Sequence, residues 1–331
     1  MYFVITLLIA SSLIFAFNNH RFSYFTKDRT CLLKAFLPYL IFIHHSHFFD
    51  GDFYYIGAFV VSLFFFISGY GLESKRGQDA INYKHLPTAL KKLLVPLIIP
   101  IVIYLFIRLF REPVEIIVED ILQYQIILPY TWFVVTLIIL YVTFYSCAVI
   151  ASRYESKVFL FLCFVIVTVL FFSLFGKYTG VPSWGRNTTT AFLAGIIYKN
   201  IENKMIGILG TSTKFYMIII SIILILVTIY IKGDILNDFM EGNFLKRPVL
   251  AFFWPLLFIP IYTIIPVLNN SAIKFLSSIS YELYVCQSIG YLLLGDKFQY
   301  PAWLYLLIVF IGCTIIASLC KSLTCLVFKQ Q

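Results

Sequence analysis

The sequence predicts an all-α integral membrane protein, a polytopic bundle of about eleven transmembrane helices. Of its 331 residues, 61% are hydrophobic and 12% are charged, whereas soluble globular chains carry about 25% charged residues. The apolar residues gather in long runs, and a bilayer favours helices for such runs because helical backbone hydrogen bonds are internal. These observations exclude a soluble enzyme, a disordered chain and a cysteine-stapled domain.

Eleven apolar stretches are predicted to span the membrane. They are 2–17, 31–49, 53–72, 88–110, 129–151, 157–176, 187–200, 213–232, 248–268, 272–294 and 302–328. The segment 187–200 is the shortest and contains Gly195. The longest loops, near 111–128 and 232–247, stay under about twenty residues, and no internal repeat is evident, so we expect no separate soluble domain.

The distribution of basic residues predicts the orientation. Of the 25 Lys and Arg, 17 fall in one set of alternating loops and eight in the other, and the richer side is expected to be cytoplasmic. This places the chain in the cell membrane with the N-terminus outside and the C-terminus inside. Residues 1–30 are expected to form a transmembrane anchor and a cytoplasmic basic loop. The net charge of +9 then faces anionic lipid and indicates no nucleic-acid partner.

Ionisable residues inside spans are functional candidates, because burying them in lipid is costly. The second span, LLKAFLPYLIFIHHSHFFDGD, has Lys34 near its inner end and His44, His45 and His47 near its outer end. Eleven residues of helix separate Lys34 from His45 by about 16 Å, so the two cannot touch but could line one passage. Histidine can act as a general base near neutral pH. The alternative is a group of interfacial polar residues.

No metal site is expected. His44 and His47 share a helix face, yet only Asp50 or Asp52 could complete a site locally. The seven Cys lie in or at the ends of apolar segments without a zinc-binding spacing, so we interpret them as small buried hydrophobic residues.

Five stretches, taken in chain order, point to one family. They are Lys34 with His45, FVVSLFFFISGYGL, TALKKLLVPLIIP, YTWFVVTLIILY and FLSSISYELYVCQ. Together they resemble the motifs of the membrane-bound acyltransferase family 3: an Arg-x10-His first helix, a Phe-Phe and Ser-Gly helix, a basic Pro-containing helix, a Trp-Phe helix and a late Ser-Tyr-x-x-Tyr-Leu-x-His motif. Ten spans follow residue 31, which is the usual core of this family, so 31–331 is expected to form a ten-helix acyltransferase-like membrane domain.

Two positions depart from the family pattern. Lys34 replaces the usual Arg, which keeps the charge but loses the bidentate fork. Gln287 stands where many members have His, which leaves His45 as the main candidate for the general base.

The resemblance implies an O-acyltransferase without a bound cofactor. Its members move an acyl group, usually acetyl, from a cytoplasmic thioester such as acetyl-CoA or another acyl-CoA to a hydroxyl of a carbohydrate or lipid-linked glycan. His45 would deprotonate that hydroxyl. A cytoplasmic cluster of Lys84, Lys91 and Lys92 could attract the phosphates of CoA, although the positive-inside rule alone also places lysines there.

Other candidates lie elsewhere in the chain. Glu282 is a carboxylate within the SYELY span that could pair with Lys34 or a histidine, or lie at the inner interface. Tyr281 and Tyr284 are three residues apart on one helix face and suit hydrogen bonding to the acceptor or to the histidine helix, or packing with satisfied hydroxyls.

Three residues on the predicted outer side complete the candidates for acceptor binding. Trp184 and Arg186 form an aromatic and polar set suited to a sugar, although Trp is also common at membrane interfaces. Arg108 could hold an anionic acceptor or stabilise an oxyanion, or it could neutralise nearby glutamates.

A transporter or flippase for a glycan or lipid-linked precursor is the main alternative from another class. Such a protein is expected to show a two-fold repeat or paired broken helices, and neither is evident in the sequence. A glycan polymerase would usually devote a long outer loop to its substrate.

Overall fold

The computed structural model describes residues 24–46, 56–76, 83–124, 128–153, 188–209, 243–263, 270–294 and 301–328, and the regular structure in these segments is helical. Contacts divide the chain into two compact units. The first unit comprises Met1–Leu32, Ala58–Asp79 and Asn187–Asn269, and the second comprises Leu33–Gly57, Ala80–Arg186 and Asn270–Gln331.

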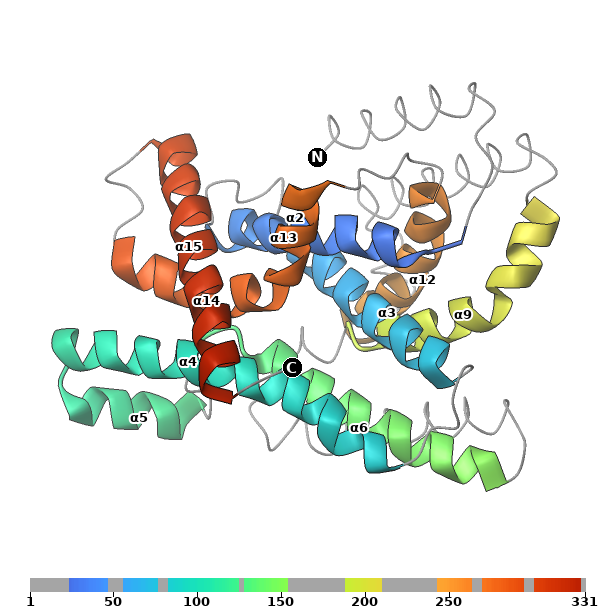
Figure 1. Cartoon of the computed structure of the whole chain (residues 1–331), viewed down its shortest axis with the longest axis horizontal. Coiled ribbons are helices and arrows are strands. Elements are labelled where there is room, and N and C mark those ends of the chain that lie inside the picture. Colours follow the sequence, from blue (N-terminus) through green and yellow to red (C-terminus); the bar gives the residue numbers. More distant parts are fainter. Residues whose placement is uncertain are drawn as a thin grey trace. The chain divides into compact units, whose positions relative to one another are not determined.

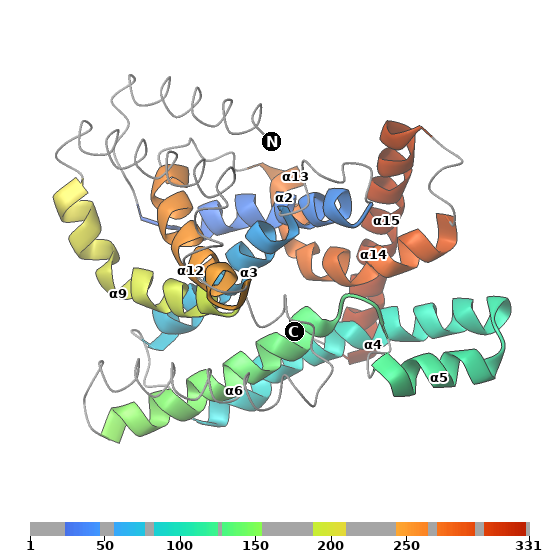
Figure 2. The same cartoon turned by 180° about the vertical axis from the view of Figure 1, so that it is seen from behind.

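The first unit is built on α3 (Ile56–Arg76), α9 (Thr190–Leu209) and α12 (Asn243–Tyr262). Helices α9 and α12 pack against each other (Figure 2). The hydroxyl of Thr190, at the start of α9, donates to the carbonyl oxygen of Pro248 at 2.6 Å. This bond ties the beginning of one helix to the first turns of the other.

Two glycines bring the backbones of α3 and α9 into contact. A Cβ added at Gly69 would meet the carbonyl oxygen of Phe192, and a Cβ added at Gly195 would meet the carbonyl oxygen of Phe66. Because backbone atoms cannot swing away as side chains do, any larger residue would push the helices apart. The crossing therefore requires glycine on both helices.

The second unit contains the remaining helices. They are α2 (Lys27–Ser46), which enters this unit after Leu32, α4 (Leu86–Arg111), α5 (Val114–Tyr124), α6 (Trp132–Arg153), α13 (Ser271–Ser278), α14 (Ser280–Leu294) and α15 (Ala302–Phe328), with a short 3₁₀ turn at Tyr83–His85. Helix α14 packs on α15 and on α4, while α4 also packs on α6. Helices α4 and α5 run side by side as an antiparallel hairpin (Figure 1).

Most predicted spans within the described segments are single helices. The spans 31–49, 53–72, 88–110, 129–151, 187–200, 248–268 and 302–328 fall on α2, α3, α4, α6, α9, α12 and α15, respectively. Among the described residues, four helices are long and apolar enough to cross a membrane: Ile56–Arg76, Leu86–Arg111, Trp132–Ala151 and Ala302–Phe328. The predicted spans 2–17, 157–176 and 213–232 lie outside the described residues.

The predicted span 272–294 is divided into two helices, because the chain turns at Ile279 between α13 and α14. Serines that compete for backbone carbonyls surround the break. The hydroxyl of Ser278 donates to the carbonyl of Phe275 at 2.7 Å, and Lys321 Nζ donates to the carbonyl of Ser278. These bonds satisfy the last carbonyls of α13 and end that helix.

The predicted loop near 111–128 contains a helix, since α5 occupies Val114–Tyr124. An ion-pair network folds α5 back onto the end of α4. Arg108 Nη2 donates to Glu112 and, at 2.6 Å, to Asp120. Pro113 precedes α5 and marks where α4 ends.

Candidate active site

His45 lies in the last turn of α2, where its imidazole meets a buried glutamine of α14. The distance from His45 Nδ1 to Gln287 Oε1 is 2.8 Å, and the side chain of Gln287 is fully buried. The His45 ring also stacks on Tyr130, with ring centroids 4.0 Å apart and planes 15° apart. Gln287 therefore fixes the position of Nδ1, and Tyr130 fixes the plane of the ring.

Tyr284 connects these two neighbours of His45. Its hydroxyl donates to the carbonyl oxygen of Tyr130 at 3.1 Å, and its own carbonyl oxygen accepts from Gln287 Nε2 at 2.8 Å. His45, Tyr130, Tyr284 and Gln287 therefore form a closed ring of contacts, which we call the His45 cluster. Its members come from α2, from the turn before α6 and from α14.

The backbone of Tyr130 adopts an unusual conformation. Its φ of 69° is positive, and among the described residues no other non-glycine residue has a positive φ. For a residue with a side chain this left-handed conformation costs about 1–2 kcal/mol. Such strain is concentrated at functional sites, where the surrounding contacts hold it. Here the ring stack on His45 and the bond from Tyr284 hold it.

A second histidine lies beside the cluster. The ring centroids of His44 and His45 are 5.1 Å apart. A Cβ at Gly57, at the start of α3, would collide with the His44 ring. A larger residue at position 57 would therefore require the His44 ring to move. Among the described residues, no group of three or more His, Cys, Asp or Glu side chains is arranged to hold a metal ion.

Lys34 and Glu282, the other predicted catalytic residues, lie in the same unit as the cluster. Lys34 is half-buried on α2, eleven residues before His45. Glu282 is buried in the first turn of α14. Lys321 of α15 donates to the carbonyl of Ser278 at the end of α13.

The tyrosines predicted to bind the acceptor both bond to backbone carbonyls. Tyr281 Oη donates to the carbonyl of Leu93 at 2.5 Å, and Tyr284 Oη donates to Tyr130 as described above. Both tyrosines therefore pack with their hydroxyls satisfied by the backbone, which is the second of the two interpretations given above. They attach α14 to α4 and to the turn before α6.

The remaining predicted residues are the lysines for donor binding and three residues for acceptor binding. Lys84 is exposed in the 3₁₀ turn before α4, and Lys91 and Lys92 are exposed on α4. Arg108 pairs with Glu112 and Asp120, so neutralisation of acidic neighbours accounts for its position. Trp184 and Arg186 lie outside the described residues.

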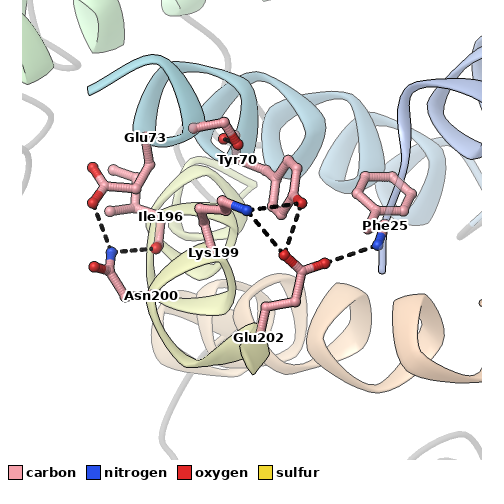
Figure 3. A network of polar contacts seen from close by, with 8 residues as sticks. Phe25, Tyr70, Glu73, Ile196, Lys199, Asn200 and Glu202 are labelled. Atoms are coloured by element: carbon pink, nitrogen blue, oxygen red, sulfur yellow. Dashed lines mark hydrogen bonds and ion pairs between the residues drawn. The ribbon is translucent and has the colours of Figure 1, made fainter. Parts of the chain in front are cut away.

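The first unit contains a separate polar network that the sequence did not reveal (Figure 3). Its centre is Glu202, which is fully buried. The carboxylate accepts from the backbone N–H of Phe25 at 2.8 Å, from Tyr70 Oη at 2.9 Å and from Lys199 Nζ at 3.1 Å. Because three donors surround one carboxylate, its charge is compensated inside the protein.

A second buried carboxylate extends this network. Glu73 accepts from Arg76 Nε at 2.7 Å and from Asn200 Nδ2 at 2.8 Å, and Asn200 also donates to the carbonyl of Ile196. Two i,i+3 pairs, Glu73 with Arg76 and Lys199 with Glu202, are the sequence signal that could have indicated these charges. They join α3, α9 and the segment before α2 within the first unit, which is a structural role.

Two members of the His45 cluster were missed by sequence reasoning. Tyr130 gave no signal beyond its place at the start of the YTWFVVTLIILY stretch. Gln287 was noted as the loss of a family histidine, and its position opposite His45 follows only from the fold.

Comparison with known protein families identifies the class of the chain. The model of acyltransferase family 3, described as an acyltransferase domain, matches residues 31–321. The chain therefore belongs to this family of polytopic membrane proteins and is an enzyme of acyl transfer, which confirms the resemblance drawn from its motifs. No curated protein and no solved structure matches the chain.

Proposed function

We propose that this enzyme transfers an acyl group, most simply acetyl, from a cytoplasmic thioester such as acetyl-CoA to a hydroxyl of a cell-surface or lipid-linked polysaccharide, with His45 as the general base. The observation that carries the proposal is the His45 cluster. In it an imidazole is bound at one nitrogen by Gln287 and stacked on Tyr130, within a chain that belongs to an acyltransferase family.

The chemical step requires one group that accepts and then returns a proton. His45 takes the proton of the acceptor hydroxyl as the oxygen attacks the thioester carbonyl carbon. The tetrahedral intermediate then collapses, the carbon–sulfur bond breaks, and the leaving sulfur takes the proton from the imidazolium. The products are an oxygen ester and a free thiol, and the enzyme returns to its starting state.

The donor is proposed to approach from the cytoplasmic side. Lys84, in the 3₁₀ turn before α4, and Lys91 and Lys92, on α4, are exposed. Their charges can attract the phosphates of an acyl-CoA. Lys34 lies about 16 Å from His45 along α2, a separation suited to a charge that holds part of the donor while its thioester reaches the histidine.

The acceptor is proposed to approach from the opposite side. This follows the orientation predicted from the basic residues, with the N-terminus outside, the C-terminus inside, residues 1–30 as an anchor and basic loop, and 31–331 as the catalytic membrane domain. Trp184 and Arg186 remain proposed sugar contacts. For Tyr281, Tyr284 and Arg108, the contacts described above favour holding the site in shape, and Glu282 remains a candidate for balancing charge near α14.

The test compares the wild-type chain with His45→Ala in cells that make the acceptor glycan. Mass analysis of surface and lipid-linked glycans is expected to show acetyl-bearing species with the wild-type chain and their loss with the variant. His44→Ala is the matched control, because it removes a neighbouring imidazole outside the cluster, and it should retain the modification at equal protein level. Full modification with His45→Ala would remove His45 from the mechanism.

A further inference from the structure

The orientation of the Gln287 side-chain amide is fixed by its two hydrogen bonds. Its nitrogen donates to the carbonyl oxygen of Tyr284 at 2.8 Å, and a carbonyl oxygen can only accept. The amide oxygen therefore faces His45. A flipped amide would set two acceptor oxygens against each other at the Tyr284 carbonyl, inside a fully buried site where an unsatisfied polar atom is costly.

The amide oxygen in turn determines which ring nitrogen of His45 carries the proton. An amide oxygen accepts but cannot donate, so His45 Nδ1, at 2.8 Å, must be the donor. In a neutral imidazole one nitrogen is a donor and the other has the lone pair. With the proton on Nδ1, the lone pair is on Nε2.

The stack on Tyr130 restricts rotation of the His45 ring and so preserves the bond between Nδ1 and Gln287. With planes 15° apart and centroids 4.0 Å apart, the ring cannot tilt freely about its bond to Cβ. A half-turn of the ring would bring Cδ2 to the place of Nδ1, and the bond to Gln287 would be lost. The tyrosine and the glutamine therefore constrain different motions of one ring.

We propose that Gln287 is a positioning residue that holds neutral His45 in the Nδ1–H tautomer, so that Nε2 is the atom that takes the proton of the acceptor hydroxyl. This inference rests on the proposed function. The same Nδ1–H···O bond persists when Nε2 is protonated, so Gln287 also stabilises the imidazolium formed during the reaction. A glutamine here performs the orienting task that a carboxylate performs in other histidine-based sites.

The first test reads the tautomer directly. The full-length chain, labelled with ¹⁵N-histidine and reconstituted in lipid bilayers, is studied by solid-state NMR. Its five histidines are distinguished by the loss of the His45 signals in His45→Gln. We expect the neutral wild-type ring to carry its proton on Nδ1. A proton on Nε2 in the wild-type chain overturns the proposal without any change at position 287.

The second test separates positioning from packing. Gln287→Met keeps the length of the side chain but removes the amide oxygen and the amide nitrogen. We expect kcat to fall about 10- to 100-fold with KM changed less than about threefold. The Nδ1-protonated form should no longer dominate in this variant. Ser288→Ala is the control on α14, because the Ser288 hydroxyl bonds within its own helix to the carbonyl of Val285, and it should retain the wild-type tautomer and kcat.

The outcomes distinguish this inference from the proposed function. If Gln287→Met keeps kcat within about twofold of wild type, or keeps the wild-type tautomer, while His45→Ala is inactive, then Gln287 is not the positioning residue and the general base stands. If His45→Ala remains active, His45 is not the general base, and the positioning role of Gln287 is rejected with it.

Discussion

The Glu202 network of the first unit and the His45 cluster of the second unit handle buried polar groups in opposite ways. In the first unit, buried carboxylates meet cations and other donors, as Glu202 does with Lys199 and Tyr70. In the second unit, the His45 cluster joins an imidazole, an amide and two phenol rings, with bonds to backbone carbonyls. The comparison teaches that charged partners fix helices in place in the first network, whereas Gln287 and Tyr130, which carry no charge, fix the position of the His45 ring.

The largest effect is expected from the centre of the first network. Glu202→Leu leaves the Phe25 N–H, the Tyr70 hydroxyl and the Lys199 charge without their acceptor, so we expect a loss of about 3 kcal/mol in the free energy of unfolding. The measurement is the fraction of chain that stays folded during thermal denaturation in detergent.

Glu119→Leu, at an exposed position of α5, is the control for Glu202→Leu and should be within about 0.5 kcal/mol of wild type. Acyl transfer per folded molecule is expected to survive in Glu202→Leu. An unchanged stability would contradict the structural role of the network, and a folded but inactive chain would contradict the separation of the two regions.

A smaller loss is expected at the glycine crossing that accompanies this network. Gly195→Ala would place a Cβ against the carbonyl of Phe66, and overpacking of this kind costs about 1–3 kcal/mol. The matched control is Gly71→Ala on α3, where nothing lies within 4 Å of the new Cβ and where alanine should stabilise the helix by about 0.5–1 kcal/mol. Equal effects of the two substitutions on thermal denaturation would show that the close crossing is absent.

The smallest effect is expected at Tyr130, and it concerns chemistry more than stability. Tyr130→Gly relieves the strain of the positive φ but removes the ring that stacks on His45. We therefore expect kcat to fall about tenfold, measured as glycan acetylation rate at saturating donor. Tyr130→Phe keeps the stack and should stay close to wild type. If the glycine variant is as active as the phenylalanine variant, the stack does not position His45.

The sequence predicted the long apolar helices well, because length and hydropathy determine them. The span 302–328 coincides with α15 at both ends. The break at Ile279 was not predictable from hydropathy, since it depends on serine hydroxyls and on Lys321 reaching from another helix. Helix α5 was not predicted, because its acidic residues favour a loop in the sequence. The pairing of Asp120 with Arg108 is seen only in the folded chain.

The candidate site was predictable in part. Histidines inside a predicted span stand out by the cost of placing them there, which indicates His44, His45 and His47 together. The family resemblance then singles out His45 among them. The sequence indicates Tyr284 and Gln287 as candidates but does not show that they surround His45, and Tyr130 does not stand out at all. A contact between residues 242 positions apart, such as His45 with Gln287, depends on the packing of α2 beside α14 and has no local signature.

The amide at position 287 has a consequence for the acid–base behaviour of the enzyme. Two facing imidazoles would share a proton, and their titration would follow two linked steps belonging to the pair. Gln287 cannot ionise, and its amide oxygen keeps the Nδ1 proton in place, so the proton delivered by the acceptor goes to Nε2. Any change of protonation across the contact between His45 and Gln287 therefore takes place on the imidazole alone.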